Sequence, residues 1–124
     1  MEKKKILVVE DELQVRELIK VVLKLENYDV EEAGNGVEAL QKLEEYMPDI
    51  ILTDVMMPEM DGVQFFLTIR ETRKTASIPV IILTVKGQME DLKYANLLGV
   101  DAYITKPFNP NDLVRQIKEL LKQV

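Results

Sequence analysis

Short apolar runs alternate with longer amphipathic stretches along the chain, and this alternation restricts the fold more than any other feature. Five runs have the length and composition of β-strands: Ile6–Val9, Tyr28–Glu32, Ile50–Thr53, Val80–Leu83 and Ala102–Ile104. Strands that are largely apolar and alternate with helices predict a parallel sheet covered by helices on both faces. Crossovers between parallel strands are right-handed, so the sheet should be doubly wound.

The stretches between these runs have the spacing of helices with one buried face. The apolar positions that carry this pattern are Val15, Leu18, Ile19, Val22 and Leu25, then Val37, Leu40 and Leu43, then Val63, Phe66 and Ile69, and finally Leu113, Val114, Ile117, Leu120, Leu121 and Val124. Asn109-Pro110 predicts a helix start, and Asp61 with Gln64 resembles a capping box. A fourth helix is expected at about Gln88–Leu98. Five strands and five helices fit a flavodoxin-like three-layer α/β sandwich with strand order 2-1-3-4-5.

The totals are those of one globular domain that spans residues 1–124. Hydrophobic residues make up 47% of the chain, which is enough for one core. Neither cysteine nor histidine occurs, which excludes disulfides, thiolate nucleophiles and histidine-based catalysis. The 16 basic and 22 acidic side chains give a net charge of −6, which disfavours nonspecific attraction to nucleic acids or anionic membranes. The unbroken apolar runs are too short to span a membrane, so we expect a cytoplasmic protein.

Polar residues follow the predicted strands where the apolar runs end. Glu10-Asp11 follow the first strand, Asp54 the third, Thr84 the fourth and Thr105-Lys106 the fifth. Ligands of open α/β sheets bind beyond the carboxyl ends of the strands, where the strand order reverses, which is between strands 1 and 3 here. Singly, Glu10 and Asp11 could cap the first helix, Asp54 could be a loop residue and Lys106 a surface lysine, but four strand ends together favour a site. Its three carboxylates would repel each other, and Mg²⁺ with the Lys106 ammonium would balance them.

At these positions the chain resembles the receiver domains of bacterial response regulators, from about Lys5 to Leu121. The matching segments are Ile6–Glu12, Asp54–Gly62, Ile82–Thr84 and Tyr103–Phe108. The resemblance implies that a sensor histidine kinase or phosphotransfer protein donates a phosphoryl group to an aspartate of this chain. It assigns phosphoryl transfer to Asp54, Lys106 and Thr84, and Mg²⁺ binding to Glu10, Asp11, Asp54 and the backbone carbonyl of Met56.

The resemblance also implies how the metal ligands differ from one another. Many members have two aspartates where this chain has Glu10-Asp11. Asp11 would therefore be the more direct ligand, whereas the longer Glu10 side chain favours a water-mediated role. No general base is required, because phosphoryl transfer depends mainly on positioning and on neutralising charge.

Three further properties follow from the resemblance. Thr84 and Tyr103 would form the switch, in which Tyr103 turns inward when the Thr84 hydroxyl moves toward the phosphoryl group; the alternative is an ordinary half-buried tyrosine. The residues that would set the phosphoryl lifetime are Met56, Val85 and Lys86. The Lys106-Pro107 peptide bond is expected to be cis.

Three other functions fit parts of the sequence. A flavin mononucleotide carrier would share the fold, but the Glu10-Asp11-Glu12 loop would repel its phosphate. A phosphatase of the haloacid-dehalogenase type would have a second aspartate where this chain has Met56. A receiver-like binding module that is never phosphorylated would not need the complete set of site residues.

The expected output is an effector protein bound through helix 4, strand 5 and helix 5. We expect a monomer that can dimerise when phosphorylated. Leu92, Ala102 and Gln116 stand where members that dimerise through this face typically have charged residues, which favours a single-domain regulator. The sequence leaves open whether the receiver stands alone or belongs to a longer regulator.

Overall fold

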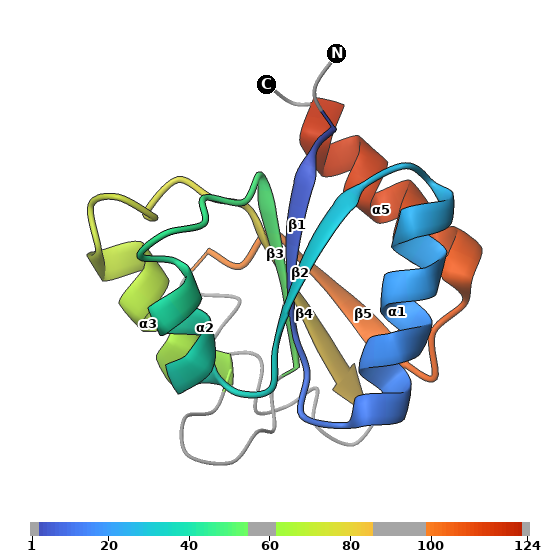
Figure 1. Cartoon of the computed structure of the whole chain (residues 1–124), viewed down its shortest axis with the longest axis horizontal. Helices are drawn as coiled ribbons and strands as arrows, with labels where there is room; N and C mark the ends of the chain where they lie inside the picture. Colours follow the sequence, from blue (N-terminus) through green and yellow to red (C-terminus); the bar gives the residue numbers. More distant parts are fainter. Residues whose placement is uncertain (1–2, 55–61, 86–98, 123–124) are drawn as a thin grey trace.

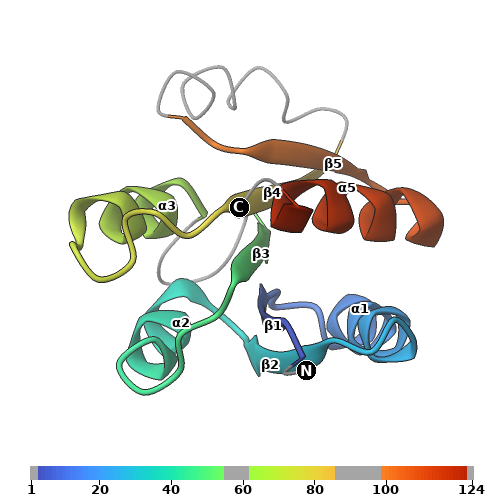
Figure 2. The same cartoon turned by 90° about the horizontal axis from the view of Figure 1, so that it is seen from above.

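The computed structural model describes residues 3–54, 62–85 and 99–122, and in them it shows one five-stranded parallel sheet with helices on both sides. The strands, which are labelled in Figure 1, follow the order β2-β1-β3-β4-β5, and Figure 2 shows this order from above. Their bounds are β1 Lys5–Val9, β2 Asp29–Ala33, β3 Ile50–Asp54, β4 Val80–Val85 and β5 Ala102–Lys106. The helices are α1 Leu13–Leu25, α2 Gly36–Lys42, α3 Gly62–Glu71 and α5 Pro110–Lys122. The predicted strand order and fold class are confirmed.

The sheet packs against a helical layer on each face, and an apolar core lies between the sheet and each of these layers. Figure 2 shows α1 and α5 over one face of the sheet and α2 and α3 over the other. Successive side chains of a strand point to opposite faces, so Ile6 and Val8 of β1 enter the α1–α5 core while Leu7 and Val9 enter the α2–α3 core. All four side chains are fully buried, which explains why this strand reads as a continuous apolar run.

The predicted stripe of α5 is confirmed, whereas that of α1 is only partly correct, because Leu18 and Leu25 are exposed and the buried Leu23 was not predicted. Ile19 and Leu23 of α1 and Leu113 and Ile117 of α5 face the sheet and are fully buried. The predicted start of the last helix is confirmed, because the Asn109 side chain accepts a hydrogen bond from the Asn111 backbone N–H at 2.8 Å.

The fourth helix expected at about Gln88–Leu98 and the Asp61 side of the capping box lie outside the described residues. The described part therefore contains four of the five expected helices.

The strand predictions were correct to within one or two residues at each end. β3, β4 and β5 continue to Asp54, Val85 and Lys106, so these polar or exposed residues belong to the strands and do not merely follow them. None of the helices in the described ranges is long and apolar enough to cross a membrane.

Candidate functional site at the carboxyl ends of the strands

The strand register brings the predicted polar residues to one end of the sheet. Val9 pairs with Thr53, so the residues that follow them, Glu10 and Asp54, come from neighbouring strands. Asp54 pairs in turn with Leu83, directly before Thr84. Parallel strands end at the same edge, which is the lower edge of the sheet in Figure 1.

Lys106 at the end of β5 joins the carboxylates from β1 and β3. Its Nζ donates to Glu10 Oε1 at 2.5 Å and lies 3.2 Å from Asp54 Oδ2. A third carboxylate oxygen, Glu12 Oε1, lies 3.9 Å from the same nitrogen. Burial opposes the charged ammonium, but the hydrogen bond to Glu10 and the negative charges of Asp54 and Glu10 outweigh it and raise the pKa of Lys106.

Glu10 is the most deeply buried acid of the site, and its side chain has no exposed surface. Its Oε2 accepts a hydrogen bond from the Glu12 backbone N–H at 3.2 Å. Burial raises the pKa of Glu10 to about 7, and the nearby Asp54 charge adds to this effect although Lys106 opposes it. Without a cation in the site, the Glu10 carboxyl group therefore ionises near neutral pH.

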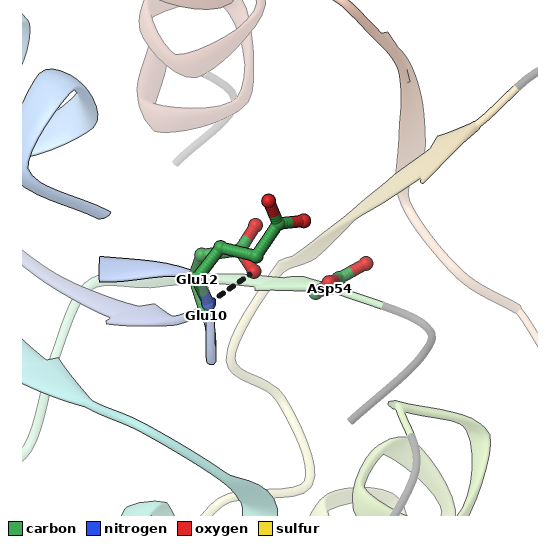
Figure 3. A group of neighbouring side chains, drawn as sticks. All are labelled: Glu10, Glu12 and Asp54. Atoms are coloured by element: carbon green, nitrogen blue, oxygen red, sulfur yellow. Dashed lines mark hydrogen bonds between the residues drawn. The ribbon is translucent and has the colours of Figure 1, made fainter. Parts of the chain in front are cut away.

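Glu12 is a site residue that the sequence analysis missed. Figure 3 shows its carboxylate beside that of Glu10, both from the segment after β1, with Asp54 opposite at the end of β3. The ligand oxygens of these three residues lie within 4.8 Å of one another. Glu12 has extended backbone angles just before α1 begins, a conformation that the sequence does not signal and that only the structure shows.

Asp11 lies between these two glutamates and is exposed. It is not part of the carboxylate group that the structure brings together among the described residues. Its assigned role as the more direct magnesium ligand therefore stays a prediction, as does the water-mediated role of Glu10. The Met56 carbonyl lies outside the described residues.

The charge and chemistry of the group suit a hard divalent cation. When all three carboxylates are ionised, the one ammonium leaves two negative charges uncompensated. The donors of Glu10, Glu12 and Asp54 are all oxygen atoms, and Mg²⁺ favours oxygen ligands, often with retained waters. These residues therefore fit a magnesium ion.

The structure also locates most of the residues predicted to respond to phosphorylation. Thr84 is fully buried, and its hydroxyl donates to the Val85 carbonyl at 3.2 Å. Tyr103 is half-buried against the α2–α3 core, and burial raises the pKa of its hydroxyl. Val85 is exposed, whereas Lys86 lies outside the described residues. The expected cis Lys106-Pro107 bond is confirmed.

Known proteins with the same arrangement identify the family. The response regulator receiver domain profile matches residues 6–118. The chain belongs to this family. The receiver is 42% identical to a transcriptional regulatory protein of Haemophilus influenzae, a CpxR homolog, over 96% of this chain and 51% of that protein. Receiver domains of this kind are the signalling phospho-acceptors of two-component systems.

Two solved structures support the same assignment. The chemotaxis response regulator CheY4 of Vibrio cholerae superposes on the receiver with a TM-score of 0.89 at 30% identity, covering 96% of this chain and 99% of that one. The receiver domain of the sensor histidine kinase PA1611 from Pseudomonas aeruginosa has a TM-score of 0.89 at 27% identity, covering 98% and 99%. That structure has a magnesium ion coordinated in its active site cleft. The chain spans about half the length of the curated relatives it matches.

Proposed function

We propose that Asp54 of this receiver accepts a phosphoryl group from the histidine of a sensor kinase or phosphotransfer protein. The observation that carries the proposal is the position of Lys106, which contacts Asp54 and Glu10 at the strand ends at 3.2 and 2.5 Å. An Asp54 carboxylate oxygen would attack the phosphorus, and the bond from phosphorus to the donor nitrogen would break. The Lys106 ammonium would neutralise an equatorial oxygen, and the Thr84 hydroxyl would bind the phosphoryl group once formed.

Magnesium would be held by carboxylates of this group. When bound, Mg²⁺ supplies charge neutralisation for the phosphoryl oxygens. The receiver's own residues hold the Lys106 ammonium 3.2 Å from the Asp54 carboxylate, where negative charge would develop on the transferred phosphoryl group. In this way the domain would promote both its own phosphorylation and the later hydrolysis of the acyl phosphate.

The phosphodonor protein would dock on α1 beside the site. Four large apolar side chains of this helix are exposed, namely Leu13, Leu18, Val21 and Leu25. A mainly apolar hollow lined by Val15, Leu18, Lys106, Pro107 and Phe108 connects this surface to the site lysine. An amphipathic helix that carries the donor histidine would cover these side chains while presenting the histidine to Asp54.

The output surface would be the one formed by helix 4, β5 and α5. Phosphorylation would draw Thr84 toward Asp54 and shift the population of Tyr103 inward, without forming a new fold. Tyr103 pairs with Ile82 two residues before Thr84, so the two switch residues lie on adjoining strands. Leu92 and the rest of the expected fourth helix lie outside the described residues, and the monomer–dimer behaviour stays a prediction.

Phosphorylation by a small donor tests the acceptor. The native chain incubated with acetyl phosphate and Mg²⁺ should gain one phosphate by intact-mass spectrometry, and Asp54→Asn should gain none. Asp49→Asn is the matched control, because Asp49 lies just before β3, where its carboxylate accepts from the Lys5 N–H at the opposite end of the sheet. Equal labelling of the native and Asp54→Asn chains would exclude Asp54 as the acceptor.

A second experiment separates the two candidate ligands beside Glu10. Mg²⁺ should raise the melting temperature of the native chain, because a ligand that binds only the folded state stabilises it. If Asp11 is the more direct ligand, Asp11→Ala should blunt this rise more than Glu12→Ala. The reverse ranking would give that role to Glu12, and an unchanged native melting curve would exclude the metal site.

A further inference from the structure

Arg16 connects the acidic site to the edge strand of the sheet. It lies in the second turn of α1, and its guanidinium makes two hydrogen bonds in different directions. Nη1 donates to the backbone carbonyl of Glu10 at 2.8 Å, and Nε donates to Glu32 Oε1, also at 2.8 Å. Glu32 belongs to β2, where it pairs with Val8 of β1.

Among the described residues, no backbone N–H pairs with the Glu10 carbonyl that Arg16 contacts. The paired register of β1 with β2 ends at Val9 and Ala33, and the Glu10 backbone N–H still donates to Ala33 O at 3.0 Å. The Glu10 carbonyl lies beyond this ladder on a fully buried residue, where an unsatisfied polar group is destabilising. Arg16 supplies the missing donor, so it fixes the peptide from which the Glu10 carboxylate extends.

We infer that Arg16 is a positioning residue for the magnesium and phosphoryl site, held in place by Glu32. A planar guanidinium presents its donors in a rigid fork, whereas the donors of an ammonium rotate freely. The Glu10 carboxylate must reach Lys106 and face Asp54 at once, so a small rotation at the Glu10 peptide would displace it from both. This inference rests on the proposed function, because it concerns the ligand geometry of that site.

The two possible roles of Arg16 predict opposite effects of its removal on Mg²⁺ binding. If Arg16 acted only through its positive charge, its removal would strengthen the binding of Mg²⁺ to the neighbouring carboxylates. If Arg16 positions Glu10, its removal would weaken this binding despite the lost repulsion. Groups that orient metal ligands typically contribute about 10- to 100-fold in affinity.

Arg16→Met and Lys20→Met make a matched pair. Lys20 belongs to the same helix and also contacts the Glu32 carboxylate, so both variants lose one positive charge from the same carboxylate. Only Arg16 also reaches Glu10. The measurement is the Mg²⁺ dissociation constant from amide chemical shifts, together with urea unfolding in metal-free buffer to record plain stability.

We expect Arg16→Met to raise the Mg²⁺ dissociation constant roughly tenfold, while Lys20→Met leaves it unchanged or lowers it. Equal or tighter Mg²⁺ binding by Arg16→Met, or equal weakening by both variants, would overturn the positioning role. If Arg16→Met does not fold, Arg16→Lys keeps the charge and should still weaken Mg²⁺ binding; an unchanged constant would overturn the inference. A native chain that binds no Mg²⁺ would instead refute the proposed function itself.

Discussion

Without a divalent cation, the receiver should lose stability as the pH rises from 4.5 to about 7, and Glu10 is the expected cause. In the folded chain, burial and the Asp54 charge raise the pKa of Glu10 from 4.5 to about 7. Between these two values the folded state keeps a proton on Glu10 that the unfolded chain has released. Stability falls with pH wherever the folded state binds more protons, so the free energy of unfolding should decrease across this window.

The size of the decrease follows from the two pKa values. Each pKa unit corresponds to about 1.4 kcal/mol, so a change from 4.5 to about 7 amounts to about 3 kcal/mol. Two other ionised groups, Lys106 and Glu32, change their contribution to stability outside the pH range between the two Glu10 pKa values. Lys106 has a pKa raised above 10.5, so its contribution is lost only at higher pH, and Glu32 has a pKa lowered below 4.5, so its contribution is lost only at lower pH.

Urea unfolding from about pH 5 to about pH 8 in the presence of a chelator measures this decrease. Glu10→Gln is the control, because it keeps the shape of the side chain and cannot titrate. The native free energy of unfolding should fall, the Glu10→Gln curve should stay nearly level, and saturating Mg²⁺ should reduce the native slope by favouring the ionised form. Native and Glu10→Gln curves with the same slope would refute the assignment.

Three further outcomes follow from the site and the fold. Asn109→Ala should lower the free energy of unfolding by about 1 kcal/mol, because it removes the N-cap of α5; a loss near zero in urea unfolding would contradict this. After phosphorylation, amide shifts should change at Tyr103 as well as around Asp54, and silence at Tyr103 would argue against the switch. Val85→Ala and Met56→Asn should each speed the loss of phosphate, since a smaller side chain admits water and a polar one orients it; unchanged decay in both would show that access there does not set the lifetime.

Part of the site could not be read from the sequence because its members are close only after folding. Lys106 and Glu10 are 96 positions apart, yet their charged atoms lie 2.5 Å apart. Parallel strands end at one edge, so the topology predicted their approach but not which oxygen each atom would contact. Glu12 was read only as a charge that repels phosphate, since its extended backbone is visible only in the structure.

The sequence by itself predicted the alternation of strands and helices, the two-sided cover of helices and the gathering of carboxylates with a lysine at one edge, and these fitted the strand order 2-1-3-4-5. These features depend on apolar periodicity and on the positions where it stops, and both are local properties of the chain. Only the tertiary structure decided that Glu10 is fully buried with a pKa near 7, and that Arg16 links its carbonyl to Glu32. Burial and hydrogen-bond direction depend on how distant segments pack, because solvent exclusion and donor geometry arise only when those segments meet.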